Sequence, residues 1–367
     1  MVLLDDLKSE GIGFHRLKKS VIDSGYCTSC GACVAFCNKL AMKETPQLIG
    51  ECILDKGPEA RCGDEGLCYD NCPMVLIQHS EYIHGETGDP QLGSYKQIKK
   101  ARTKKTTIQE NAQDGGAVTT LLLAALENKL IDGALVVDKD EKWNTVPKLI
   151  TTKEELQKTA GSKYTVCPNV LYMGKVLKNL QLRDIAIVGT PCQIHAVRNL
   201  QETLFDQRSE DAEVKIYTIG LFCSGTFHYD KLIAHAPGTD ITKVKRMDFK
   251  KNNLQIKAEE TVIIPIDELE ETMMESCHLC IDYTAELADI AVGSVGTPKG
   301  WSTVIVRSEL GEELLKNATK TGYLETEDEV NTEHLKKVVS KKKEKAMTKV
   351  LGKITKKQPV PPVYRKE

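Results

Sequence analysis

Residues 184–200 read DIAIVGTPCQIHAVRNL and carry the clearest signal of the fold. The first six residues form the nearly continuous apolar run that is typical of a strand buried on both faces of a parallel sheet. The Gly-Thr-Pro that follows predicts a tight turn into a helix, because proline favours the first position of a helix. A strand followed at once by a helix is the repeating unit of α/β proteins, and Cys192 lies at the junction.

The same alternation of strands and helices extends along the chain on both sides of this stretch. The first helix is expected to be capped by Asp114. The expected strands are 132–137, 184–189, 213–223 and 302–308, and the expected helices are 114–128, 170–180, 190–200 and 308–322. We therefore predict an α/β domain with a mostly parallel or mixed sheet.

The chain of 367 residues is longer than one ordinary hydrophobic core supports, so we expect a large domain and a smaller module. Residues 1–85 lack regular periodicity and are rich in Cys, Gly, Asn and Asp, and 84–95 has the Gly and Pro content of a linker. We predict a ferredoxin-like module at 1–85, a cofactor-binding domain at 95–335 and a basic helix or tail at 336–367.

Apolar residues make up 41% of the chain and charged residues 28%, the balance of a soluble globular protein. No run of about eighteen apolar residues is present, so no membrane span is predicted, and the acidic start MVLLDDLKSEGIG does not resemble a signal peptide. We therefore expect a cytoplasmic protein. In that reducing compartment, clustered cysteines are more often metal ligands or catalytic groups than disulfides.

Eight of the thirteen cysteines lie within the first module. CTSCGACVAFC at 27–37 has the CxxCxxCxxxC spacing of bacterial ferredoxins, in which the first three cysteines bind one 4Fe–4S cluster and the fourth binds a second. The later cysteines end in Cys-Pro but have irregular gaps, and Asn38 stands where proline is typical. The favoured partition is Cys27, Cys30, Cys33 and Cys72 for one cluster and Cys37, Cys52, Cys62 and Cys68 for the other. Structural zinc sites, which also use four thiolates, are the alternative.

Four of the remaining five cysteines can form a third set. Cys192 and Cys223 follow two predicted strands, and the carboxyl ends of parallel strands meet at one edge of a sheet. Cys277 and Cys280, in SCHLC, would complete a set of four and so predict a third 4Fe–4S cluster. A redox-active dithiol has the same CxxC spacing and is the alternative. Cys167 is left over and is expected to be an inert buried thiol.

Iron–sulfur clusters carry single electrons, so a two-electron carrier is expected beside them, and a flavin is the usual converter. The sequence contains no GxGxxG fingerprint of a dinucleotide-binding Rossmann fold. It does contain short glycine turns at predicted strand and helix ends: QDGGAV at 113–118, GTPCQ at 189–193 and GSVGTPKGW at 293–301. Backbone N–H groups at such turns can hold a phosphate or an electron-rich ring edge, although any one of them is more simply a tight turn.

The net charge of −2 conceals a basic C-terminus. From Lys336 onward there are twelve Lys or Arg and two Glu. One interpretation is a solvated, partly helical tail that packs through Leu335, Val338 and Val339; the other is an electrostatic guide for an anionic partner. No aromatic residue interleaves the lysines between 336 and 357, so a nucleic-acid partner is not predicted.

Several longer motifs occur together in this chain: QDGG at 113–116, GSKYTVCPN at 161–169, VGTPCQ at 188–193, GLFC at 220–223, CHLCIDYTAELADIAVGSVG at 277–296 and GWSTVIVR at 300–307. In these motifs and their order, the chain resembles the beta subunits of coenzyme F420-reducing hydrogenase and of F420-dependent dehydrogenases, over roughly residues 95–345. With its two-cluster module it is similar to longer members, such as the F420-oxidising subunit of reduced-F420 dehydrogenase and the N-terminal half of F420-dependent sulfite reductase. Chlorophyll-pathway reductases belong to the same superfamily.

The resemblance implies a bound FAD, a 4Fe–4S cluster on the GTPC, GLFC and CxxC cysteines, and hydride transfer between FAD and coenzyme F420. It implies a charged contact from Lys163 to the flavin or deazaflavin ring, which makes Lys163 the candidate catalytic residue. The cofactor-binding residues that it implies are Gln113, Asp114, Gly115, Gly116, Thr119, Lys163, Tyr164, Gly189, Thr190, Pro191, Gly293 and Gly296.

We therefore predict a flavin iron–sulfur oxidoreductase that transfers hydride between coenzyme F420 and FAD. It is expected to move single electrons through three 4Fe–4S clusters to or from a partner protein. Expected partners are coenzyme F420 and a redox complex such as heterodisulfide reductase, an F420-oxidising dehydrogenase or formate dehydrogenase. The alternatives are a ferredoxin-dependent tetrapyrrole reductase of the chlorophyll pathway, an electron-transfer subunit with no substrate of its own, and a zinc-stabilised interaction protein.

Overall fold

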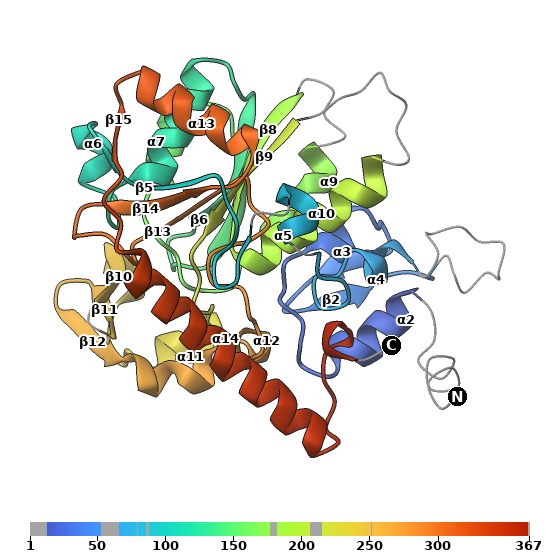
Figure 1. The fold of residues 1–367 in the computed structure, drawn as a ribbon. Coiled ribbons are helices and arrows are strands. Elements are labelled where there is room, and N and C mark those ends of the chain that lie inside the picture. The colour runs from blue at the N-terminus through green and yellow to red at the C-terminus, as the bar shows by residue number, and fades with distance from the viewer. Residues whose placement is uncertain are drawn as a thin grey trace.

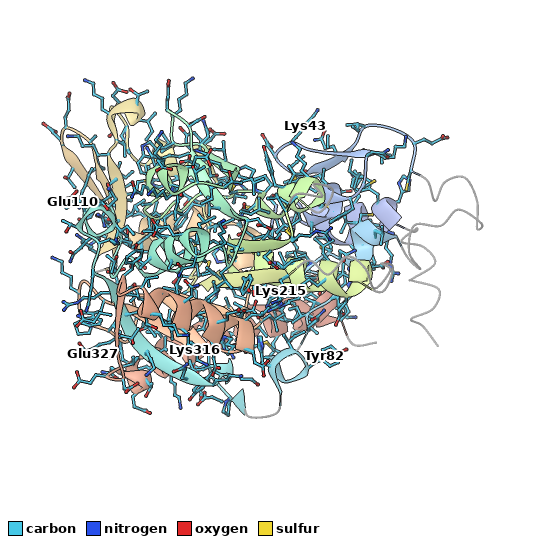
Figure 2. The ribbon with its side chains drawn as sticks, turned by 90° about the horizontal axis from the view of Figure 1, so that it is seen from above. Lys43, Tyr82, Glu110, Lys215, Lys316 and Glu327 are labelled. Carbon is cyan, nitrogen blue, oxygen red and sulfur yellow. The ribbon has the colours of Figure 1, made fainter. Side chains whose placement is uncertain are left out.

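The structure is a computed structural model that describes residues 13–52, 66–78, 80–85, 88–176, 182–205, 215–250 and 252–365. Figure 1 shows a twisted central sheet with helices on its faces, a small N-terminal module beside it and a long C-terminal helix that runs past both. Seen from above, Lys43 of the N-terminal module lies toward one side of the molecule and Glu110 of the main domain toward the other (Figure 2). No helix among the described residues is long and apolar enough to cross a membrane.

The core of the main domain is an eight-stranded mixed sheet, as the sequence predicts. Its central strands β6, β8, β9 and β13 run parallel to one another, while β7 and β14 are antiparallel to their neighbours. In spatial order the strands are β15 (Leu324–Glu327), β5 (Gln97–Thr103), β14 (Ser302–Val306), β13 (Ile290–Gly293), β9 (Lys215–Leu221), β8 (Asp184–Gly189), β6 (Gly133–Lys139) and β7 (Thr145–Ile150).

Helices cover both faces of this sheet, which explains the continuous apolar runs of its strands. Ala186 and Val188 of β8 point to the face packed by α7 (Ala117–Glu127) and α13 (Glu309–Lys320). Ile185 and Ile187 point to the opposite face, under α10 (Pro191–Phe205) and the short helices η3 (Asn169–Tyr172) and α9 (Met173–Val176). Because both faces of these strands are covered, apolar residues occupy successive positions, and the alternation of apolar and polar residues is absent from their sequences.

The expected Asp114 cap of the first helix is wrong. The N-cap of α7 is Gly116, whose φ of +67° lies in the left-handed region that favours glycine. The preceding Gly115 is equally constrained, because a Cβ there would lie 2.3 Å from the carbonyl oxygen of Ala101. QDGG is therefore a tight turn against β5 rather than the first turn of a helix.

Two features of the main domain escape the sequence analysis. A separate three-stranded antiparallel sheet consists of β10 (Arg246–Lys250), β11 (Asn253–Lys257) and β12 (Thr261–Pro265). The expected linker at 84–95 contains a packed hairpin, β3 (Gly88–Asp89) and β4 (Gly93–Ser94), in which Leu92 is fully buried. The other short elements are α6 (Thr106–Gln109), α8 (Lys153–Lys158), α11 (Tyr229–Ala234), η4 (Ile241–Lys243), η5 (Ile266–Thr272), α12 (Glu275–His278) and η6 (Pro362–Tyr364).

The N-terminal module is built from very short elements, as its lack of periodicity predicts. It contacts the main domain closely where Gly31 lies on Leu171 and Gly174 lies on Ala35. A Cβ at Gly174 would be 1.7 Å from the Ala35 carbonyl oxygen, so only glycine allows this approach. The elements are α2 (Gly13–Leu17), η1 (Lys18–Ile22), α3 (Ala32–Ala35), β1 (Leu40–Met42), β2 (Pro46–Leu48), α4 (Leu67–Asp70) and α5 (Ser80–His84).

The basic C-terminal segment forms the long helix α14 (Thr332–Thr355), which is packed and not a solvated tail. Its buried residues are Leu335, Val339, Ala346 and Val350. Several of its lysines pair with acidic residues of the main domain: Lys336 with Asp89, Lys343 with Glu286, Lys345 and Lys349 with Glu270, and Lys353 with Glu275. Much of the positive charge is therefore used within the chain.

Candidate functional site

Several predicted site residues of the main domain lie at one edge of the main sheet. Strands β8, β9 and β13 are parallel, so Thr190 and Cys192, Cys223, and the 293–296 turn all follow strands at the same carboxyl edge. Strand β5 runs the same way, because it and β13 are both antiparallel to β14, and β5 leads toward the 113–116 turn. This edge is where open α/β sheets bind their ligands.

Backbone hydrogen bonds hold the CxxC segment at this edge. The amide of Cys223 donates to the carbonyl of Tyr283 over 2.9 Å, and the amide of Met274 donates to the carbonyl of Thr226 over 3.0 Å. The segment after β9 is thus joined to both sides of α12, which contains Cys277. The late cysteine pair reaches the strand ends through these contacts.

The four thiols at the sheet edge lie close enough to influence one another. Burial raises the pKa of Cys192 well above its usual value, and the nearby Cys277, Cys223 and Cys280 raise it further. Burial also raises the pKa of Cys223 to about 12, and Cys277 and Cys280 add to that effect. None of the four forms a disulfide. Buried thiols that oppose one another's ionisation become thiolates when a metal binds them.

Four thiols are a donor set that either a single zinc ion or a 4Fe–4S cluster uses. Across the part of the chain that the structure describes, no three His, Cys, Asp or Glu side chains converge closely enough to hold one metal ion. A single zinc draws its thiolates to within about 2.3 Å of one centre. A 4Fe–4S cubane instead gives each of four thiolates its own iron, so the sulfurs stand farther apart.

The structure also gathers the described cysteines of the N-terminal module. Burial raises the pKa of Cys33 well above its usual value, with further increases from Cys30, Cys27, Cys72 and Cys68. The pKa of Cys72 is raised in the same way, and Cys30, Cys27 and Cys68 contribute. The proposed first set therefore shares one neighbourhood, with Cys68 next to it.

The second N-terminal set is described only in part. Cys52 and Cys68 are buried in one apolar cluster, and Cys37 packs against it. The remaining predicted ligand, Cys62, lies outside the described residues.

Two of the three glycine turns predicted to hold the flavin lie against each other. The amide of Gly115 donates to Ser302 Oγ over 3.1 Å, and the Gly115 carbonyl accepts a bond from the amide of Thr103. Burial raises the pKa of Asp114, while Arg246 and a hydrogen bond with Ser294 oppose the increase. The 113–116 turn thus touches both the 293–296 turn and β14.

Tyr164 and Gln113 belong to the same region. The Tyr164 ring packs edge-on against Phe249, with centroids 4.8 Å apart, and burial raises its pKa to about 12. Asp114 contributes to that increase, so the Tyr164 hydroxyl lies near the 113–116 turn. Arg246 donates to the Gln113 carbonyl over 3.3 Å. Thr119 lies in the first turn of α7, directly after this loop.

The glycine turns and the cysteines are neighbours. A Cβ at Gly293 would lie 2.0 Å from the ring of Phe222, which directly precedes Cys223. Thr190 Oγ1 lies 3.3 Å from Cys192 Sγ, and Pro191 begins α10 between them. Gly189 lets the chain turn over Gln193, whose side chain would be 3.0 Å from an added Cβ. The fold thus places the predicted cofactor turns beside the predicted cluster ligands.

Lys163 is half-buried, and its Nζ donates to the Thr159 carbonyl. Burial lowers the pKa of Lys163 to about 8, and the nearby Asp138 opposes that decrease. Cys167 lies beside it, and burial raises its pKa to about 12, which fits the inert thiol that the sequence predicts. None of the described contacts of Lys163 reaches the glycine turns.

A cavity of about 560 Å³ lies between the Cys27 loop and α12. Its lining includes Cys27, Lys231, Glu270 and His278. None of the residues predicted to hold the flavin lines this cavity. It therefore separates the N-terminal module from the CxxC segment rather than marking the predicted flavin turns.

Two residues beside the sulfurs are absent from the predicted site. The amide of Thr226 donates to Cys277 Sγ over 3.4 Å, and its Oγ1 lies 3.6 Å away. Lys342 of α14 donates to the carbonyls of Cys223 and Asp282 and lies 3.6 Å from Cys280 Sγ. Thr226 follows Cys223 closely in GLFCSGTF, which is a weak signal, and Lys342 is hidden in a run of lysines.

The fold and the site together define the class of this protein. It is an α/β protein whose parallel strands end at an edge lined by four free thiols and two glycine turns. Such an edge is the usual ligand-binding side of a sheet of this kind.

Comparisons with known proteins are specific. Two family models match: coenzyme F420 hydrogenase/dehydrogenase, beta subunit N-term, at 98–173, and the corresponding C terminus at 182–332. The coenzyme F420 hydrogenase subunit beta of Methanothermobacter thermautotrophicus is 38% identical over 264 residues, which is 70% of this chain and 94% of that protein. The coenzyme F420-dependent sulfite reductase of Methanocaldococcus jannaschii is 36% identical over 333 residues, 87% of this chain and 49% of that protein.

A solved structure agrees with these matches. A chain in the F420-reducing NiFe hydrogenase complex from Methanosarcina barkeri aligns with a TM-score of 0.70 at 31% identity, covering 76% of this chain and 100% of that chain. The present chain therefore belongs to the coenzyme F420 hydrogenase/dehydrogenase beta subunit family. The family resemblance seen in the sequence is confirmed.

Proposed function

We propose that this chain is a flavin iron–sulfur oxidoreductase subunit that exchanges hydride between coenzyme F420 and FAD and passes single electrons to or from a partner protein. The observation that carries the proposal is the convergence of Cys192, Cys223, Cys277 and Cys280 at the edge of the sheet. They come from three separate segments and lie beside the 113–116 and 293–296 turns.

The relatives support the choice of coenzyme F420 as substrate. The hydrogenase subunit and the sulfite reductase are both named for that coenzyme, and the similar solved chain comes from a complex. We infer that this chain likewise uses coenzyme F420 and works with a partner. The N-terminal module supplies the path between them, with two further clusters on the cysteines predicted above.

The residues of the chain have defined roles in this proposal. When bound, FAD would convert a two-electron hydride into single electrons, which the 4Fe–4S clusters would carry onward. The 113–116 and 293–296 turns offer backbone N–H groups for phosphate or ring atoms. Thr190 and Thr226 place hydroxyl groups beside the sulfurs of Cys192 and Cys277, where they would adjust the potential of a bound cluster.

An assay of electron transfer tests the proposal. The full chain, purified without oxygen and supplied with FAD, is expected to reduce a viologen dye with reduced coenzyme F420 as donor. A chain that loads FAD and iron but shows no reaction with reduced coenzyme F420 would contradict it. Activity with reduced ferredoxin and a tetrapyrrole would instead identify the chlorophyll-pathway alternative.

Lys163 should give this reaction a characteristic pH dependence. Because its pKa is lowered to about 8, its charge is lost as the pH rises through that value. We expect kcat/KM for reduced coenzyme F420 to fall above about pH 8, and Lys163→Met to lower it about tenfold at pH 7, the size of one charge-assisted hydrogen bond. Lys163→Arg should move the alkaline fall to higher pH, because arginine stays charged. If both variants kept the wild-type pH dependence of kcat/KM, Lys163 would have no role in the reaction.

The same group gives a stability test with a definite sign. An unfolded lysine has a pKa of about 10.4, so between about pH 8 and pH 10 the unfolded chain binds the proton more often than the folded one. The free energy of unfolding contributed by Lys163 should therefore rise with pH over that range. The difference in the free energy of unfolding between the wild-type chain and Lys163→Met, measured over this pH range, isolates the contribution of Lys163.

A further inference from the structure

We propose that Lys342 is a positioning residue that fixes a positive charge beside the Cys192, Cys223, Cys277 and Cys280 set and raises the reduction potential of the cluster that they hold. The proposal rests on the cluster assignment made above, and it goes beyond it by naming the residue that adjusts this cluster. It also gives α14 a role, since the matched family segment ends at residue 332.

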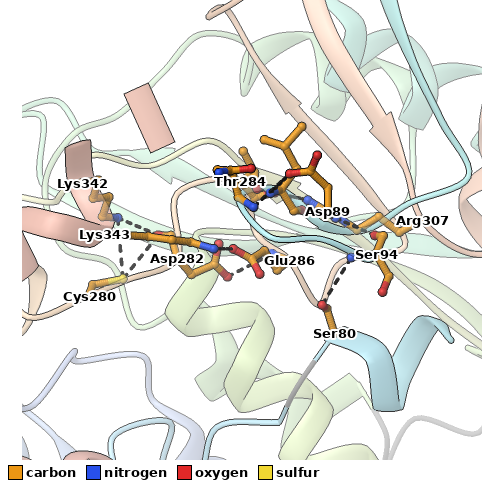
Figure 3. A network of polar contacts seen from close by, with 12 residues as sticks. Ser80, Asp89, Ser94, Cys280, Asp282, Thr284, Glu286, Arg307, Lys342 and Lys343 are labelled. Atoms are coloured by element: carbon orange, nitrogen blue, oxygen red, sulfur yellow. Dashed lines mark hydrogen bonds and ion pairs between the residues drawn. The ribbon is translucent and has the colours of Figure 1, made fainter. Parts of the chain in front are cut away.

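The contacts of Lys342 all lie on the cluster-binding segments. Its Nζ donates to the Asp282 carbonyl over 2.6 Å and lies 3.6 Å from Cys280 Sγ (Figure 3). It also donates to the Cys223 carbonyl over 2.7 Å. An ammonium group has three donors, and these three partners use all of them. Lys342 thereby joins the segment after β9 to the CxxC segment.

Lys342 differs from the other lysines of α14. Lys336, Lys343 and Lys353 each pair with a carboxylate of the main domain. Among the ion pairs of the described residues, none includes Lys342. Asp282 accepts a bond from Lys342 through its backbone carbonyl, whereas its carboxylate contacts His195 over 3.0 Å. Lys342 Nζ therefore contacts carbonyl and sulfur atoms directly, and the nearby Asp282 carboxylate acts on it only electrostatically.

Lys342 lies on the face of α14 that otherwise carries its buried apolar residues. Leu335, Val339, Ala346 and Val350 form the buried stripe of α14, and Lys342 falls between Val339 and Ala346 at the spacing of that stripe. The Lys343–Glu286 ion pair of 2.7 Å anchors the next residue. Lys342 is half-buried there, and removing an ammonium group from water is costly unless hydrogen bonds or opposite charges compensate for the lost hydration.

The physical effect follows from the charge balance of reduction. Reduction adds one electron to the cluster and breaks no bond, so the reduced cluster is one unit more negative. A fixed positive charge within a few ångströms stabilises that state, and burial strengthens the interaction because the local dielectric is low. Hydrogen bonds to the sulfurs act in the same direction.

The test is an EPR-monitored redox titration of the full chain, with dithionite as reductant. The titration step that is missing in Cys277→Ser identifies the cluster at the sheet edge. Lys342→Gln is expected to lower the equilibrium constant for its reduction about tenfold, which is about 59 mV for one electron. Lys342→Arg keeps the charge and should stay within about threefold of the wild-type value.

Lys345→Gln is the matched control, because Lys345 is on the same helix but is 60% exposed and pairs with Glu270. Lys345→Gln should leave the equilibrium constant for reduction within about threefold of the wild-type value. The proposal is overturned if Lys342→Gln does not shift the potential, if the Gln and Arg variants shift it equally, or if Lys345→Gln shifts it as much.

Loss of the cluster is also informative. A cluster that assembles in Lys342→Arg but not in Lys342→Gln supports the need for the charge, whereas failure of both variants to assemble it shows a packing role and overturns the proposal. The titration uses no coenzyme F420, so a chain inactive with that coenzyme can still support or contradict the role of Lys342. A wild-type chain with no EPR-detectable cluster overturns both proposals.

Discussion

Cys277→Ser is expected to remove about four irons per chain and to abolish electron transfer from reduced coenzyme F420 to a viologen. Cys277 supplies one of the four thiols at the sheet edge, and Thr226 already positions its sulfur. Loss of a residue that merely supports a metal ligand costs about 10- to 100-fold, so loss of a ligand should exceed that range. Iron analysis and the viologen assay give the two readouts.

Cys167→Ser is the control for this experiment. Cys167 is also buried, and its carbonyl accepts a bond from Gln193, a contact that the substitution leaves in place. The iron content and activity of Cys167→Ser should match those of the wild-type chain. Equal iron in Cys277→Ser and the wild-type chain would show that the sheet-edge cysteines do not share a cluster.

Asp289→Ala should lower the free energy of unfolding by about 3–5 kcal/mol, the cost of leaving one partner of a buried ion pair uncompensated. Asp289 is 2% exposed and pairs with Arg198 over 3.0 Å. Its carboxylate also accepts bonds from Ser308 Oγ and from the amide and hydroxyl of Thr218. The residue thus joins α10, β9 and the start of α13 behind the site.

The effect should depend on pH with a predictable sign. Burial alone would raise the pKa of Asp289, but Arg198, Ser308 and Thr218 hold it below its usual value. Its stabilising contribution is therefore complete above the unfolded pKa of about 3.9 and is lost as the pH falls through the folded pKa. Urea denaturation at pH 7 and at acidic pH measures both quantities.

Asp328→Ala is the matched control for Asp289→Ala. Asp328 also pairs with a basic residue, Lys99, but it is 86% exposed, so its loss should cost less than about 1 kcal/mol. Equal losses in the two variants would contradict the structural role of Asp289.

The parts of the fold that the sequence predicts are those with local signals. DIAIVG and the other apolar runs identify strands because burial on both faces leaves no polar positions. The small sheet β10–β12 was missed because charged residues lie inside it. Asp248 is fully buried there, held by Arg246 and Lys257. Such pairing appears only when the strands are assembled.

The candidate site divides in the same way. The cysteines are visible in the sequence because their spacing and their places after strands are local properties. Lys342 is not, because it meets Cys223 across 119 residues of chain. The basic C-terminus illustrates the general reason: a count of lysines cannot distinguish those paired with distant acids, such as Lys343 with Glu286, from those left for a partner.

The most direct test of the central claim is the iron, sulfide and zinc content of the full wild-type chain purified without oxygen. Clusters on the sheet edge and in the N-terminal module predict about twelve irons and about twelve acid-labile sulfides per chain, with no stoichiometric zinc. Two to three zincs in place of iron (roughly one per four thiolates) would show that the four thiols at the sheet edge hold no iron–sulfur cluster.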